Sequence, residues 1–292
     1  MSAGETLDRD RSPAENAQLA LLLEVAGTPK PGNVDRHRDL ESLRFEHFLA
    51  GAIGSGAGLR TAQQGASVGD AFETAVAGMS NQRGGNTQFG CLLLLVPLVA
   101  TAASGALTPT RARDTVESTT VEDAVAFYRS FERVDVAVRD PPADVDALDV
   151  RRGGAAAEAI RDREMTLYDI MILSAEPTTN RPADGNAREW TTGFERSFRA
   201  ADELLSDEGP VGDRIARTFL RLLAEEPDTL VATNHGTETA RDVCDRAAAI
   251  GLDLDAAAQL AETFVDGGIN PGTTADLTAA AAFIALERGL TV

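Results

Sequence analysis

The residues best suited to chemistry lie in four short polar clusters between helical patterns, at residues 30–39, 84–87, 228–236 and 267–276. The first follows Thr28-Pro29 and reads Lys30-Pro31-Gly32-Asn33-Val34-Asp35-Arg36. It holds the single lysine of a chain that has 27 lysine and arginine residues in all. A lysine ammonium is a compact point charge and an arginine guanidinium is a planar fork, so the two do not substitute for each other at a phosphate or beside a metal. A lysine kept only here indicates a specific task.

The segment around Lys30 is stiff and non-helical. Its prolines fix two φ angles and push Thr28 and Lys30 toward extended conformations, while Gly32 permits a turn or a close backbone approach. It presents a cation, an amide (Asn33) and a carboxylate (Asp35), which is typical of an active-site loop. The alternative is a solvated Pro-Gly loop that carries its lysine by chance. We favour the site and expect Lys30 to be exposed.

The second cluster, Arg83-Gly84-Gly85-Asn86-Thr87, precedes a long apolar stretch. Asn86 and Thr87 are therefore predicted to lie at a helix N-terminus, where free N–H groups and the helix dipole favour an anion such as phosphate. Capping of a core helix explains the same two residues equally well.

The last cluster contains Asn270-Pro271-Gly272, which predicts a turn, and then Thr273 or Thr274 as the N-cap of the final helix. Asp276 falls in the first turn of that helix. The helix dipole favours an acid there, so Asp276 taken alone is explained by structure as readily as by catalysis.

Composition limits the classes of function. The 292 residues carry a formal net charge of −19, with acids spread along the whole chain. This composition is typical of an extreme halophile, because a dense carboxylate surface stays hydrated when salt screens long-range charge. No basic patch supports nucleic-acid binding. An anionic substrate is therefore expected to need a local cationic pocket.

Cysteines, histidines and apolar runs indicate a soluble cytoplasmic protein. Cys91 and Cys244 lie in apolar surroundings and are expected to be reduced core residues. The histidines at positions 37, 47 and 235 lack zinc-site spacing. The N-terminus has no signal-peptide pattern, and Pro97 and Gly105 interrupt the longest apolar run, so no membrane span is expected.

Helical periodicity predicts an all-α, single-domain fold of about ten to twelve helices over residues 13–292, with residues 1–12 disordered. Ser12-Pro13-Ala14-Glu15 predicts a capped helix start, and residues 119 and 122 a second capping box. Residues 105–119, 138–147 and 176–188 are expected to be loops, the last a candidate lid. The glycines of 51–58 could form a dinucleotide-binding loop, but close helix packing explains them better because no strand precedes them. The expected helices span 14–26, 44–58, 68–82, 88–103 (buried at the centre), 121–131, 150–163, 166–175, 189–206, 211–225, 237–250, 255–265 and 274–288.

Taken together, these motifs resemble the triphosphoribosyl-dephospho-CoA synthases. The resemblance rests on Glu24 with the Thr28–Arg36 segment, Asn86-Thr87-Gln88-Phe89-Gly90, Asp228-Thr229-Leu230 with Gly236, and Asn270-Pro271-Gly272-Thr273-Thr274-Ala275-Asp276-Leu277. It spans residues 15–288. It implies an all-helical, Mg²⁺-dependent transferase that removes adenine from ATP and joins the triphosphoribose to the ribose 2′-hydroxyl of dephospho-CoA.

The resemblance also implies roles for individual residues. Lys30 would contact phosphate, acids would hold magnesium or act as base, and amides and hydroxyls would contact the ribose and phosphates. The implied catalytic residues are Lys30, Asp35, Asp39 and Asp276; the magnesium ligands are Glu24, Asp35, Asp39 and Asp276; the substrate contacts are Gly32, Asn33, Arg36, Gly85, Asn86, Thr87, Asn234, Asn270 and Thr274.

Two departures from bacterial members point to an archaeal branch. After the Lys-Pro-Gly element the chain reads His37-Arg38-Asp39-Leu40, with Asp39 the only acid that aligns, and Gln88-Phe89 replaces His-Lys. One alternative is phosphoribosyl transfer from phosphoribosyl pyrophosphate in pterin-type cofactor synthesis. Another is a non-catalytic nucleotide-binding protein. The acceptor and the oligomeric state stay open, with a homodimer among the options.

Overall fold

The computed structural model describes residues 11–138, 145–177 and 183–292, and these residues form helices and loops without a strand. The predicted all-α fold is confirmed. Most of the segment expected to be disordered, residues 1–10, lies outside the described residues. The helices run over Pro13–Ala26 (α1), Phe45–Gly54 (α2), Gly56–Gln63 (α3), Val68–Met79 (α4), Phe89–Ala103 (α5), Pro109–Glu117 (α6), Val121–Ser130 (α7), Asp146–Leu148 (η1), Val150–Ala156 (η2), Ala157–Asp162 (α8), Leu167–Ala175 (α9), Gly185–Thr192 (α10), Glu195–Ser206 (α11), Val211–Glu225 (α12), Thr229–His235 (α13), Thr237–Ile250 (α14), Leu254–Asp266 (α15) and Gly272–Glu287 (α16).

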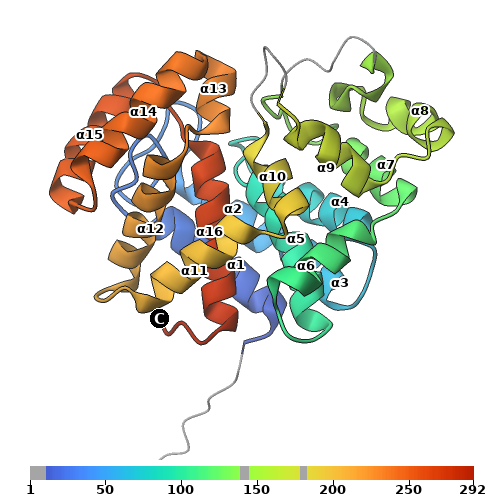
Figure 1. The fold of residues 1–292 in the computed structure, drawn as a ribbon, viewed down its shortest axis with the longest axis horizontal. Helices are drawn as coiled ribbons and strands as arrows, with labels where there is room; N and C mark the ends of the chain where they lie inside the picture. The colour runs from blue at the N-terminus through green and yellow to red at the C-terminus, as the bar shows by residue number, and fades with distance from the viewer. Residues whose placement is uncertain (1–10, 139–144, 178–182) are drawn as a thin grey trace, which may run out of the picture.

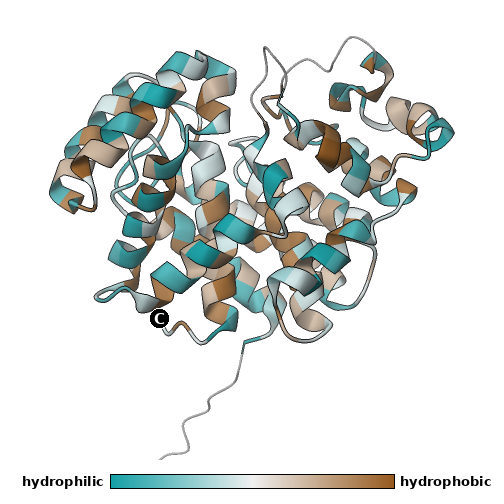
Figure 2. Cartoon of the chain, viewed as in Figure 1, coloured by the Kyte–Doolittle hydropathy of each residue, from teal (hydrophilic) through white to brown (hydrophobic). Residues whose placement is uncertain are grey.

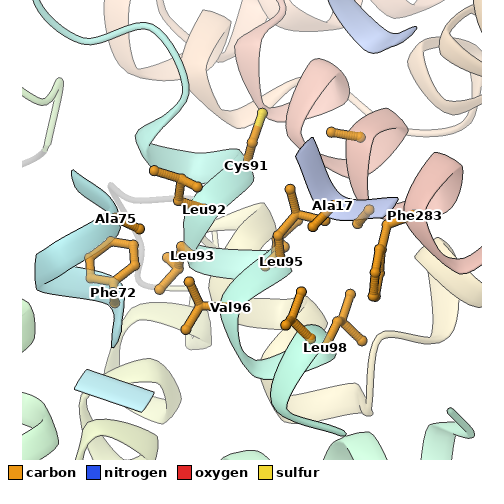
Figure 3. Packing of buried hydrophobic residues seen from close by; sticks show 14 of the residues in the cluster. Ala17, Phe72, Ala75, Cys91, Leu92, Leu93, Leu95, Val96, Leu98 and Phe283 are labelled. Atoms are coloured by element: carbon orange, nitrogen blue, oxygen red, sulfur yellow. The ribbon is translucent and has the colours of Figure 1, made fainter. Parts of the chain in front are cut away.

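Helix α5 is the centre of the core, as its uniformly apolar sequence predicts. Figure 3 shows Leu95 and Leu98 of α5 directed toward α1 and α16, while Val96 faces α4 on the opposite side. All three side chains are fully buried. The outer helices, such as α11 and α14 in Figure 2, alternate between hydrophilic and hydrophobic residues, as expected for helices with one buried face.

Helices α12 to α15 and the N-terminal part of α16 enclose a smaller apolar cluster that includes Phe219, Val231 and Phe264. Figure 1 shows α13, α14 and α15 on one side of α16, and α7, α8 and α9 on the other. The two groups of helices therefore flank the central helices α5 and α16. No described helix is both long and apolar enough to cross a bilayer.

Close helix packing, and not a dinucleotide loop, explains the glycines of α2 and α3. A Cβ atom on Gly54 would lie 2.1 Å from the carbonyl oxygen of Gly78 in α4, and one on Gly58 would lie 2.2 Å from the amide nitrogen of Ala75. Both helices therefore cross α4 with their backbones in contact. The predicted start of α1 is also confirmed, since Ser12 and Glu15 form the capping box.

Several predicted boundaries are wrong, and the chain forms more helices than expected. Residues 105–119 contain α6, whose start at Thr108-Pro109 uses the same cap-and-proline signal as α1. The predicted helix over 44–58 is interrupted at Ser55. The one over 189–206 is broken by the left-handed conformations of Gly193 (φ 74°) and Phe194 (φ 62°).

Two further corrections concern helix starts. The capping box of α7 is formed by Thr120 and Asp123, one residue later than predicted, because the Thr119 hydroxyl donates to the carbonyl of Val116 instead. Helix α13 was not predicted. It begins where Asp228 accepts hydrogen bonds from the amides of Leu230 and Val231. Its seven residues are too few to show helical periodicity.

Candidate active site

A cavity of about 470 Å³ lies where the N-terminal ends of four helices meet. These helices are α5, α10, α13 and α16; Figure 1 shows α5, α10 and α16 between the two flanking groups and α13 in the group with α14 and α15. The first residues of each contribute to the lining. Some of the first N–H groups already donate to the capping side chains of Asn86, Asp184 and Asp228. The positive ends of the helix dipoles favour an anion. The cavity is therefore suited to a phosphorylated ligand.

Asp276 lies on the wall of this cavity in the first turn of α16. Its Oδ2 accepts a hydrogen bond of 2.8 Å from the Asn186 side-chain amide, and its Oδ1 one of 3.1 Å from the Cys91 thiol. Enclosure by the protein raises the pKa of Asp276 to about 7, and the nearby charges of Asp228 and Glu24 add to the shift. A carboxylate with this pKa is matched to proton transfer at neutral pH.

Gly90 makes room for Asp276 beside α5. A Cβ atom at this position would lie 2.0 Å from Oδ2 of Asp276 and 2.7 Å from the Asn186 side-chain nitrogen. Any larger residue would displace the carboxylate or its partner. Gly90 closes the motif that begins at Asn86, so the requirement for glycine there has a direct physical reason.

Lys30 is completely buried, and the expectation of an exposed loop lysine is wrong. Its ammonium forms an ion pair with Glu24 of α1 and donates a hydrogen bond of 2.9 Å to Oδ1 of Asn33. The Asn33 amide in turn donates to Oδ1 of Asn270 at 3.0 Å. Glu24, Asn33 and Asn270 line the cavity and Lys30 does not. Lys30 therefore positions Glu24 and Asn33 without lining the cavity itself. Burial raises the pKa of Glu24, and the charge of Lys30 opposes that shift.

Asp35 lies within the loop and away from the cavity lining. It accepts hydrogen bonds from the Thr28 hydroxyl (2.8 Å), the backbone amides of Lys30 (3.2 Å) and His37 (2.8 Å), and the Arg38 guanidinium (3.2 Å). The carboxylate therefore fixes the conformation of the loop that presents Asn33.

Asp39 is exposed and accepts a hydrogen bond of 2.8 Å from the amide of Phe45 at the start of α2. It does not reach the cavity lining. Gly32 supplies the predicted close approach: its φ is +76°, and a Cβ atom would lie 2.4 Å from the carbonyl oxygen of Ile269. This contact holds the loop against the segment that carries Asn270.

The structure brings some of the predicted substrate contacts together and separates others. Asn33, Asn86, Thr87, Asn234 and Asn270 line the cavity, with Asn86 also capping α5 through a 3.1 Å hydrogen bond from the Phe89 amide. The remaining four, which do not line it, are Arg36 and Gly85, both exposed, Gly32 in the loop, and Thr274, whose amide and hydroxyl donate to buried Asp228.

Acids line the cavity, and the expectation of a cationic pocket is wrong. Among the described lining residues there is no lysine, arginine or histidine, whereas five are acidic: Glu24, Asp135, Asp149, Asp184 and Asp276. Lys30 and Arg151, which do not line the cavity, pair with Glu24 and Asp149, and the helix N-termini offset part of the remaining negative charge. A highly charged phosphate ligand would need cations that it brings with it.

Magnesium fits this arrangement in one particular way. The described residues contain no group of three or more histidine, cysteine or acidic side chains that could hold a metal ion. Magnesium is usually bound by one or two carboxylates together with substrate phosphates, and it keeps several waters. Of the four predicted ligands, Glu24 and Asp276 line the cavity, while Asp35 and Asp39 do not. Two carboxylates facing a phosphate site are sufficient for a metal that arrives with its nucleotide.

Sequence reasoning missed Asn186 and underestimated Cys91. Asn186 lies in the segment predicted to be a lid, and its contact with Asp276 joins residues that are 90 positions apart. Cys91 is free and buried as expected, yet its thiol touches the carboxylate. The side-chain oxygens of Asn186 and Thr87 are buried without a hydrogen-bond partner in the described chain. Buried polar atoms are rarely left unpaired, so both are candidate ligand contacts.

Comparison with known proteins agrees with the motifs. A solved structure from Archaeoglobus fulgidus, described as a candidate triphosphoribosyl-dephospho-CoA synthase, aligns with a TM-score of 0.69 and 28% sequence identity. The alignment covers 85% of this chain and 100% of the other. No curated protein matches the chain. The model of the CitG family, ATP:dephospho-CoA triphosphoribosyl transferase, matches residues 10–291. The chain therefore belongs to the CitG family of transferases.

Proposed function

We propose that this protein transfers the triphosphoribosyl group of ATP to the ribose 2′-hydroxyl of dephospho-CoA, with release of adenine. Family membership supports the reaction class. One observation supports placing the proposed reaction in this cavity: Asp276 lines it and has a pKa of about 7. The N-terminal ends of helices surround the same cavity. The cavity thus combines a base with a place for the triphosphate.

Asp276 is the base of the proposed reaction. The acceptor oxygen bonds to C1′ of the ATP ribose while the bond from C1′ to adenine breaks. The hydroxyl proton passes to Asp276, and one proton ends on the departing adenine. The carboxylate also stabilises positive charge that develops on the ribose ring. Asn186 and Cys91 hold it in place through the two contacts described above.

The N-terminal ends of α5, α10 and α16 hold the triphosphate in this proposal, and the Thr87 hydroxyl offers it a further donor. The unpaired Oδ1 of Asn186 is an acceptor and suits a ribose hydroxyl. Glu24 is the candidate magnesium ligand, because the ion pair with Lys30 favours its charged form. Magnesium, when bound, would neutralise phosphate oxygens that the acidic lining cannot. The requirement for the metal is a proposal that rests on the lack of lysine, arginine and histidine in the described lining.

Product analysis tests the reaction. The protein is incubated with ATP, magnesium and dephospho-CoA, and nucleobases and nucleotides are separated by chromatography. We expect free adenine without ADP or AMP, and no adenine when EDTA removes the metal. A parallel reaction replaces ATP with phosphoribosyl pyrophosphate. Pyrophosphate release in that reaction alone would favour phosphoribosyl transfer, whereas no product with either donor would favour a non-catalytic nucleotide-binding protein.

A further inference from the structure

The cavity has an apolar wall that the proposed chemistry does not use. We define it by six lining residues of α7, α9 and the segment between them: Phe127, Phe131, Leu148, Ile170, Met171 and Leu173. Figure 1 shows α7 and α9 on the opposite side of the central helices from α13. The apolar wall therefore faces the part of the cavity remote from Asn234 of α13.

This wall is formed before any ligand arrives. The rings of Phe127 and Phe131 pack edge to face with centroids 5.2 Å apart, and Phe131 also packs against Phe89 of α5 at 4.9 Å. The Tyr128 hydroxyl donates a hydrogen bond of 2.6 Å to the carbonyl of Leu148. That bond fastens the segment with Leu148 to α7. A rigid apolar surface lowers the entropy lost when a ligand is ordered against it.

The lining around the apolar wall is poorly suited to the triphosphate and to the adenine ring of the substrates. Asp135 and Asp149 lie in the same part of the cavity; Asp149 pairs with Arg151, and Asp135 repels a triphosphate. An adenine ring needs hydrogen-bond partners along its edge. The asparagines of the lining lie outside the apolar wall, in α10, α13 and the loops before α2, α5 and α16: Asn33, Asn86, Asn186, Asn234 and Asn270. An uncharged chain with apolar substituents can place these substituents against the wall, while any amide groups that it carries meet the polar lining or solvent.

We infer that the apolar wall binds the pantetheine arm of dephospho-CoA and so selects the acceptor among adenine nucleotides. The inference rests on the proposed function. ATP and dephospho-CoA share the adenosine portion, so a site that distinguishes them must recognise what differs. The pantetheine arm is uncharged, carries a dimethyl group and extends away from the reacting ribose. Burial of its apolar surface against this wall supplies affinity that ATP and ADP cannot obtain.

Two neighbouring residues of α9 give a matched test. Leu173 lines the cavity and is 36% exposed, whereas Ile172 is 37% exposed and does not line it. Leu173→Gln is expected to raise KM for dephospho-CoA about fivefold, as loss of part of one apolar contact predicts, while kcat and KM for ATP stay unchanged. Ile172→Gln should leave all three constants unchanged. Pantetheine alone should inhibit competitively against dephospho-CoA and not against ATP.

Three results would overturn the inference: a KM for ATP that rises in Leu173→Gln, equal effects of the two substitutions, or competition of pantetheine with ATP. The first would assign the wall to the adenine of the donor. If wild-type protein releases no adenine, the proposed function fails first. The affinities of dephospho-CoA and ADP, measured by calorimetry, then test the role of the apolar wall independently of the reaction. Tighter binding of dephospho-CoA that Leu173→Gln removes would support the inference, and equal binding of the two nucleotides would contradict it.

Discussion

At the scale of single residues, the buried surroundings of Asp276 disfavour the charged form of its carboxyl group. Its pKa is raised from 3.8 to about 7, so between these values the folded state binds the proton more tightly than the unfolded state. The contribution to folding is therefore greatest below pH 4 and is lost as the pH rises through 7. Asp276→Asn should raise the free energy of unfolding at pH 8 by roughly 1–3 kcal/mol and abolish adenine release.

Urea denaturation at pH 8 and pH 4 measures the first effect, which should disappear at the lower pH. For the second, kcat of the wild-type protein should increase with pH across about 7, because the base must be deprotonated. A stability difference that is the same at both pH values would contradict the burial of a charge at Asp276, and a rate independent of pH would contradict its role as base.

Lys30 affects both stability and the site. Lys30→Met leaves Glu24 buried without its ion-pair partner. Removal of one member of a buried pair typically lowers the free energy of unfolding by about 3–5 kcal/mol. We expect such a loss by thermal or urea denaturation. The double variant Glu24→Gln/Lys30→Met should recover most of the stability and none of the activity. Full stability of the single variant would contradict the burial of the pair.

At the scale of elements, the site depends on how closely α5 approaches α16. Gly90→Ala would place a methyl group 2.0 Å from Oδ2 of Asp276. We expect adenine release to fall at least about tenfold, because a displaced catalytic group loses its alignment, with the circular dichroism spectrum unchanged. Gly267→Ala is the control, since the nearest atom to its new Cβ lies at 3.4 Å. Equal activity of both variants would contradict the placement of Asp276.

The elements that could be predicted from sequence are those with local signals. The apolar run of α5 and the capping box of α1 each indicate a helix without knowledge of the rest of the fold. The break between α10 and α11 could not be predicted in this way, because Phe194 adopts a left-handed conformation that local preference disfavours. Tertiary packing determines the backbone conformation at such positions.

The residues of the candidate site also divide into those with a local sequence signal and those without one. Asp276, Asn86 and Asn270 fall in motifs that sequence reasoning identified, and all three line the cavity. Lys30 was identified as well, but its burial depends on Glu24 and Asn33 enclosing it, which composition and spacing do not reveal. Asn186 lacked a local signal, because its importance arises from a contact with a distant helix.

At the scale of the whole molecule, the charge of −19 governs behaviour in salt. We propose that the protein is adapted to high salt, as its acidic composition indicates. Stability should then fall below about 1 M KCl, where carboxylate repulsion is less screened. Melting temperatures between about 0.1 and about 3 M KCl measure this, with sucrose as a non-ionic control. A melting temperature that KCl does not change would contradict the adaptation.

Transfer of the triphosphoribosyl group from ATP to dephospho-CoA is the central claim, and the mass of the acceptor product tests it most directly. Wild-type protein, magnesium, ATP and dephospho-CoA should yield an acceptor heavier by one triphosphoribosyl group, with one free adenine per product. Asp276→Asn under the same conditions should yield neither. An unmodified acceptor, or a product heavier by a phosphate or an adenylyl group, would contradict the account.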